Sequence, residues 1–95
     1  MKVIEEIAAE RERQQSVEGW SIGHDDEHDD GALARAAASY AFIGSFESRG
    51  ATHATKPVYW PWDRAWWKPK DRRTDLIRAG ALIVAEIERL DRVSA

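Results

Sequence analysis

Residues 59–73 read YWPWDRAWWKPKDRR and contain four of the five tryptophans of the chain. Pro61 and Pro69 prevent one continuous helix here, because proline lacks the amide hydrogen that a helix interior requires. Apolar and polar residues do not alternate with the two-residue period of a strand. We therefore predict a rigid irregular loop with one short helical turn at residues 63–67.

This tryptophan loop, as residues 59–73 are called below, combines aromatic rings with positive charge. Six basic residues stand between positions 56 and 73, against the acidic Asp63 and Asp71. Indoles supply much apolar surface, and cationic side chains stack on their faces. Trp66 and Trp67 are adjacent, so they cannot both point inward from one short turn. The loop can fill a small core or hold a flat anionic ligand, and both interpretations are open at this point.

The overall composition indicates one small domain over residues 1–95. The chain has a net charge of −3 and no cysteine, which excludes disulfides and thiolate metal sites. A domain of this length buries only about 60–65% of its unfolded surface, so we expect it to form a homo-oligomer. No apolar run approaches the roughly 20 residues that span a bilayer, and no signal-peptide pattern follows Met1. We expect a cytoplasmic protein without a membrane partner.

Three segments have the residue pattern of helices, with apolar residues at three- and four-residue intervals. The segments are residues 2 to about 17, 31 to about 46 and 70 to about 90 or 93. Gly19 is expected to end the first helix in the left-handed conformation. Asp29 or Asp30 is expected to cap the second helix, and Asp71 the third. We predict an all-α fold of three main helices, with the tryptophan loop packed over the junction of the second and third.

The same periodicity predicts which helix faces are buried. The expected stripes are Val3, Ile4, Ile7, Ala8 and Arg11 in the first helix, Leu33, Ala36, Ala37, Tyr40 and Ile43 or Gly44 in the second, and Leu76, Ala79, Ile83, Ile87 and Leu90 in the third, which Leu82 and Val84 widen. Gly80 costs roughly 1 kcal/mol relative to alanine inside a helix, so we expect it to allow close contact with the second helix or with an indole. Residues 47–57 are expected to form a mobile connection.

The acidic segment 24–30 offers an alternative metal site. His24 and His28 are four residues apart, as in the zincin helix, but Asp25 stands where that helix requires a glutamate. HD-type metal phosphohydrolases need an upstream histidine, and none precedes His24. An acidic segment that caps the second helix explains the pattern better. We expect no metal and no cofactor, and keep His24, Asp25 and His28 as the alternative.

Catalysis has little further support in the sequence. Carboxylates such as Glu6 and Glu10 invite comparison with MazG-type nucleotide pyrophosphohydrolases, in which about four carboxylates converge on Mg²⁺. Here the acids stand among Arg11 and Arg13, as on an ordinary solvated helix face. No serine stands in the context of a catalytic elbow or triad. We therefore expect no catalytic residue.

The remaining signal is the aromatic and basic set, which suits an anionic ligand. In this hypothesis one or two indoles sandwich a nucleobase, and Arg72 and Arg73 clamp phosphate. Tyr40 or His24 bonds the ribose or the base edges. The candidate binding residues are Trp20, His24, Tyr40, Trp60, Trp62, Trp66, Trp67, Lys68, Lys70, Arg72 and Arg73. The negative overall charge argues against general nucleic-acid binding.

Several short motifs also follow one another in a distinctive order. They are Glu10-x-x-Arg13-Gln14, Glu18-Gly19-Trp20-Ser21-x-Gly23, Asp25-Asp26, Tyr40, Lys68-Pro69-x-Asp71-Arg72 and the apolar run AGALI at 79–83. This order resembles the repeat domain of ryanodine receptors (RyR), in which a Gly-Trp turn and an Asp-rich loop follow a helix and a Lys/Asp-Arg motif opens the last helix. The Pro-Tyr that follows the acidic loop in that family is missing, and the Trp-Pro-Trp at 60–62 is this chain's own.

The blocks HDD at 24–26, WPW at 60–62 and EIERLDR at 86–92 also resemble those of small proteins from tailed phages and prophages. The resemblance implies a phage origin and a nucleotide-related ligand. The leading hypothesis is non-enzymatic binding of a nucleotide or nucleotide-derived signal, by a phage anti-defence protein that sequesters a bacterial immune messenger in the host cytoplasm. The alternatives are a MazG-like metal-dependent nucleotide pyrophosphohydrolase and a protein that inhibits a host enzyme through tryptophan anchors.

Overall fold

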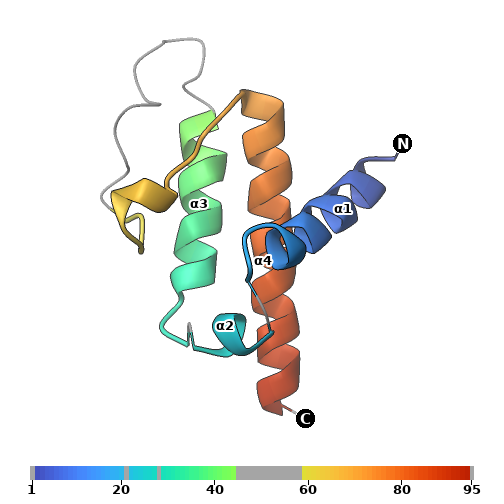
Figure 1. Cartoon of the computed structure of the whole chain (residues 1–95), viewed down its shortest axis with the longest axis vertical. Coiled ribbons are helices and arrows are strands. Elements are labelled where there is room, and N and C mark those ends of the chain that lie inside the picture. The colour runs from blue at the N-terminus through green and yellow to red at the C-terminus, as the bar shows by residue number, and fades with distance from the viewer. Residues whose placement is uncertain (1, 21, 28, 45–58, 95) are drawn as a thin grey trace.

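Two long helices that run antiparallel, side by side, form the centre of the molecule (Figure 1). The computed structural model describes residues 2–20, 22–27, 29–44 and 59–94. The central pair is α3 (Ala32–Gly44) and α4 (Arg72–Ser94), and α1 (Val3–Ser16) lies across α4. A short helix, α2 (Ile22–Asp26), and a 3-10 turn at Arg64–Trp66 complete the order. The predicted all-α class with three main helices is confirmed, and the described residues contain no strand.

Side-chain caps set the helix ends where the sequence predicted them. Asp71 accepts hydrogen bonds from the backbone N and the hydroxyl of Thr74, both at 2.8 Å, and so starts α4. Asp30 accepts from the backbone N of Ala32 at 3.1 Å at the start of α3. Gly19 has a φ of 77° after the end of α1, a conformation that side chains with a Cβ rarely adopt. The two caps and the left-handed conformation of Gly19 are confirmed, although α1 already ends at Ser16, with Val17 as its C-cap.

The predicted turn inside the tryptophan loop is also present. Asp63 caps the 3-10 turn, because its carboxylate accepts from the backbone N of Ala65 at 2.9 Å. The backbone oxygen of Asp63 accepts from the indole Nε1 of Trp60 at 3.2 Å. Each of these bonds satisfies a polar group that the irregular backbone or the buried indole would otherwise leave unpaired. The loop is therefore held by its own side chains.

Helix α2 was not predicted, since the acidic segment was expected to be a loop. A buried ion pair holds it in place: Arg11 Nη2 of α1 lies 2.6 Å from Asp25 Oδ2. Arg11 Nε also reaches Glu88 of α4 at 3.2 Å, and Asp25 is fully buried. The segment thus joins α1 to α4, and this long-range pairing was invisible in the local pattern of acids.

The core between α3 and α4 is built largely from small residues. Buried side chains of α3 are Ala32, Leu33, Ala36, Ala37, Ser39 and Tyr40, and those of α4 include Ala79, Ala81, Leu82 and Ala85. Small side chains permit a close approach of two helix axes. Trp60 and Trp67 belong to the same buried cluster. The predicted inner face of α3 is confirmed for its residues up to Tyr40.

Of the predicted core face of α4, Ala79 and Leu82 are buried and Val84 is half-buried, but the other four residues of the stripe are not buried. Leu76, Ile83, Ile87 and Leu90 are 45–52% exposed and form an outward apolar face. The residues that face α3 lie between them along the helix and are mostly alanines, so the bulkier stripe misled the prediction. In α1, Val3, Ile4 and Ala8 of the predicted stripe are likewise exposed, whereas Arg11 of that stripe is buried together with Gln14.

Gly80 provides close contact, but with α1 rather than with α3 or an indole. A Cβ added there would lie 3.0 Å from Cδ1 of Ile7. The predicted mobile connection at 47–57 lies outside the described residues. Of the helices in the described ranges, none combines the length and the apolar character needed to cross a membrane.

Candidate ligand-binding pocket

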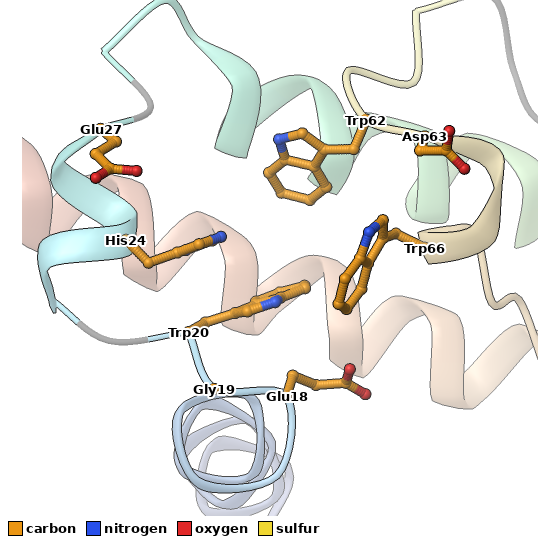
Figure 2. A pocket seen from close by; sticks show the side chains of 8 residues that line it. All are labelled: Glu18, Gly19, Trp20, His24, Glu27, Trp62, Asp63 and Trp66. Atoms are coloured by element: carbon orange, nitrogen blue, oxygen red, sulfur yellow. The ribbon is translucent and has the colours of Figure 1, made fainter.

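A pocket of about 420 Å³ opens between the end of α1, helix α2 and the tryptophan loop (Figure 2). Its walls are the rings of Trp20, His24, Trp62 and Trp66. Glu18, Glu27 and Asp63 supply three carboxylates, and the backbone of Gly19 completes the lining. The volume falls within the range of small-molecule sites, roughly 300–1,000 Å³. We call this cavity the indole pocket.

Trp20 and His24 form one wall as a pair of parallel rings. Their centroids are 5.6 Å apart and their planes differ by 7°. The backbone N of Trp20 donates to the carbonyl of Gln14 at 3.0 Å, which ties this residue to the end of α1. His24 sits on α2, and its Nδ1 lies 3.2 Å from Oδ1 of the buried Asp25. The wall is therefore anchored to two helices.

Trp62 forms the wall above the Trp20–His24 pair in the view of Figure 2 and packs against the core. Its ring lies 5.5 Å from that of Trp20 at an angle of 58°, and 6.4 Å from that of His24. Behind it, Trp60 meets Trp62 edge to face at 5.3 Å and 84°. Edge-to-face contacts fix the relative orientation of aromatic rings. Trp62 thus has a core side and a pocket side.

Trp66 closes the pocket on the third side and is 45% exposed. The ammonium of Lys68 lies 5.4 Å from the centroid of this ring, a distance at which the ring face attracts a cation. Lys68 Nζ also reaches Glu18 Oε2 at 3.4 Å. The Lys68 charge is therefore held beside the pocket by a ring and a carboxylate.

Glu18 is ionised and bridges two cations. It accepts from Arg13 at 3.1 Å and from Lys68 at 3.4 Å. Burial alone would raise the pKa of Glu18, but the hydrogen bonds and charges of Arg13 and Lys68 together outweigh it and lower this pKa below its ordinary value. The carboxylate therefore stays charged down to acid pH.

The other two carboxylates belong to exposed residues. Glu27, at the α2 end of the pocket, is exposed, and Asp63 is exposed at the loop end. Figure 2 shows the Asp63 carboxylate directed away from the space between the rings, in keeping with its capping bond to Ala65. The lining of the indole pocket contains no lysine and no arginine.

Three of the predicted binding residues lie in the core beneath the pocket and do not line it. Tyr40, Trp60 and Trp67 are at most 7% exposed. The ring centroid of Trp67 lies 4.9 Å from that of Tyr40 and 4.9 Å from that of Trp60. The Tyr40 hydroxyl accepts a hydrogen bond from the backbone N of Lys68 at 3.3 Å. Burial raises the pKa of Tyr40, and the Lys68 bond only partly offsets this. These rings support the pocket from behind.

The basic residues at the start of α4 also lie away from the indole pocket. Arg73 forms a two-point bond with Glu6 of α1, at 2.8 and 2.5 Å, beside a separate hollow of about 300 Å³. Arg72 is an exposed residue in the first turn of α4, and the backbone N of Lys70 donates to Asp75 at 2.9 Å. The structure therefore brings together Trp20, His24, Trp62 and Trp66 of the predicted set, but not Arg72 and Arg73.

The alternative metal ligands are not gathered either. Asp25 is engaged by Arg11, and His28 lies outside the described residues. In the part of the chain that the structure describes, no three His, Asp or Glu side chains come together in a way that could hold a metal ion.

A scan against protein-family models, a search of curated proteins and a search of solved structures each gave no match to this chain.

Sequence reasoning missed the acidic side of the pocket. Glu18 directly precedes the Gly19-Trp20 turn, and Asp63 stands between two predicted ring residues. Their positions next to Trp20 and Trp62 were the available signal. For Glu27 the sequence offered no such signal beyond its place in the acidic segment 24–30.

Proposed function

We propose that the protein is a non-enzymatic binding module, and that the indole pocket holds one flat or compact apolar group of a small ligand. One observation carries this proposal: three indoles and an imidazole surround a common open space instead of filling the core. A small domain with a thin core would gain stability by burying such rings completely. Trp66 leaves nearly half of its surface exposed.

The supports behind the rings fit a binding role. Trp20 is bonded to α1, His24 contacts the buried Asp25, and Trp62 packs on Trp60. Rings that are held in place before binding lose little conformational freedom when a ligand arrives. The walls of the pocket are therefore preorganised.

A nucleotide or nucleotide-derived signal, as the sequence suggests, is the second candidate. The parallel rings of Trp20 and His24 support it, because a base stacked on an aromatic side chain is worth on the order of 1–3 kcal/mol. The phosphate would need a cationic partner, but the lining has no lysine or arginine, Lys68 beside Trp66 is paired with Glu18, and Arg73 bonds Glu6. An anti-defence role belongs to this hypothesis, whereas self-association is a separate expectation that follows from the small core.

The direct test is calorimetry of the folded protein against a panel of nucleosides, cyclic dinucleotides, ADP-ribose derivatives and methylated ammonium compounds. At least one class should bind, and Trp66→Ala should weaken binding by about ten-fold or more, the equivalent of one lost stacking contact. Phe42→Ala is the matched control, because it removes an exposed ring outside the pocket. If no compound binds, or if Trp66→Ala and Phe42→Ala bind alike, the proposal is wrong.

A further inference from the structure

We infer that the ligand group in the indole pocket is an organic cation, and specifically a methylated or quaternary ammonium. This inference rests on the proposed function, which it makes more specific. It is drawn from the sign of the charge around the rings. A methylated ammonium presents a diffuse positive charge and an apolar surface at the same time, and both properties have counterparts in the lining.

The rings supply the first counterpart. The face of an indole is electronegative and attracts cations within about 6 Å of its centre, and tryptophan is the best of the aromatic residues in this respect. Trp20, Trp62 and Trp66 approach the pocket from three directions (Figure 2). One of them already acts in this way, because the Lys68 ammonium lies 5.4 Å from the Trp66 ring.

The carboxylates supply the second counterpart. Glu18 and Glu27 line the pocket, while the carboxylate of Asp63 is directed away from the rings; no lysine or arginine is among the lining residues, although Lys68 lies beside Trp66. Arg13 and Lys68 offset the charge of Glu18 from outside, at 3.1 and 3.4 Å. Glu27, from α2, adds a further negative charge beside the rings. A ligand phosphate would meet this charge with repulsion, whereas an ammonium would be attracted.

The aromatic walls also favour methylated over unmethylated ammonium. A primary ammonium carries three N–H donors and is strongly hydrated, so it loses hydrogen bonds to water when it enters between rings. Methyl groups remove these donors and spread the charge over an apolar surface. The ring-lined part of the pocket therefore selects the methylated form, while the carboxylates select the charge.

The test compares choline with 3,3-dimethylbutan-1-ol, its neutral isostere of nearly the same shape, by calorimetry at low salt. Adenosine monophosphate serves as the anionic probe. We expect choline to bind at least about ten-fold more tightly than the neutral isostere and than the nucleotide. Glu27→Gln should weaken choline binding a few-fold and leave the isostere unchanged. Glu12→Gln is the matched control, because Glu12 is an exposed glutamate of α1 outside the pocket.

The outcomes separate this inference from the proposed function. Equal binding of choline and the isostere, or tighter binding of the nucleotide, overturns the cation inference while leaving a functional pocket. Loss of all three probes in Trp66→Ala, with choline preferred in the wild type, supports both. Failure of all three probes to bind the folded wild-type protein overturns the cation inference, and the proposed function is overturned as well only if the wider panel of compounds also fails to bind.

Discussion

Trp60 and Trp67 differ from Trp62 and Trp66 in what their rings do, although all four lie within eight residues. Trp60 and Trp67 are 4% and 7% exposed and pack with Tyr40 in the cluster between α3 and α4. Trp62 is half-buried, Trp66 is 45% exposed, and both line the indole pocket. The tryptophan loop therefore contributes both to the core and to the pocket. Trp60 and Trp67 stabilise the fold, and Trp62 and Trp66 are available to a ligand.

The difference arises from the turn that the loop makes. Pro61 follows Trp60 and prevents a regular helix there. The 3-10 turn capped by Asp63 then directs successive side chains to opposite sides. Trp66 and Trp67, although adjacent, consequently point to the pocket and to the core. This division predicts that changes on the two sides will separate stability from binding.

The largest expected effect comes from truncating a core indole. Trp60→Ala should lower the free energy of unfolding by about 3–5 kcal/mol, because it removes a buried ring that touches Tyr40, Trp62 and Trp67. Trp66→Ala should cost less than about 1 kcal/mol, since much of that ring is already in water. Denaturant unfolding measures both. Equal losses of unfolding free energy in the two variants would contradict the distinction between core indoles and pocket-lining indoles.

A somewhat smaller effect is expected where the pocket is anchored to the helices. Asp25→Asn should cost about 3 kcal/mol, because it leaves the buried Arg11 guanidinium without its closest charge partner. It should also weaken ligand binding, since α2 carries His24. The control is Asp26→Asn, at an exposed pair with Arg92, which should cost less than about 1 kcal/mol. A stable Asp25→Asn variant with unchanged binding would show that α2 is not held by this pair.

A smaller loss of stability is expected in acid, where protonation of Glu18 weakens its contacts with Lys68 of the tryptophan loop and Arg13 of α1. In the folded state the pKa of Glu18 is lowered: burial opposes the shift, and Arg13 and Lys68 together outweigh it. The backbone and hydroxyl bonds from Thr74 likewise lower the pKa of Asp71. A lowered carboxyl pKa adds stability that is present above the unfolded value and lost as pH falls through the folded one.

Unfolding free energy should therefore be constant near neutrality and decline below about pH 4. Glu18→Gln should flatten part of this decline and, through loss of the Lys68 contact, shift Trp66 fluorescence. If the unfolding free energy of Glu18→Gln declines as steeply with falling pH as that of the wild type, other carboxylates account for the acid sensitivity.

The sequence was informative where a local rule determines the structure. The Asp71 and Asp30 caps and the left-handed Gly19 each follow from a few neighbouring residues. The inner face of α3 could be predicted because its alanines and Tyr40 share one stripe. In α4 two stripes compete, and only contact with α3 decides that the alanines, rather than Leu76 and Ile83, face inward.

The aromatic residues of the pocket could be predicted from the sequence, but the sign of the charge beside them could not. The tryptophans were identified as binding candidates, yet their directions depend on the turn at 63–67 and on the core below. The partner of Arg73 is Glu6, which is 67 residues away along the chain. Since such pairings are set by the fold, the sequence indicated a basic pocket where the structure has carboxylates.

The five indole N–H signals in a nitrogen–proton correlation spectrum test the central claim most directly, through titration of the isotope-labelled protein with choline. The signals of Trp20, Trp62 and Trp66 should shift with one common saturation curve, while those of Trp60 and Trp67 stay in place. Shifts confined to Trp60 and Trp67, equal shifts of all five, or no shift at saturating choline would contradict the account.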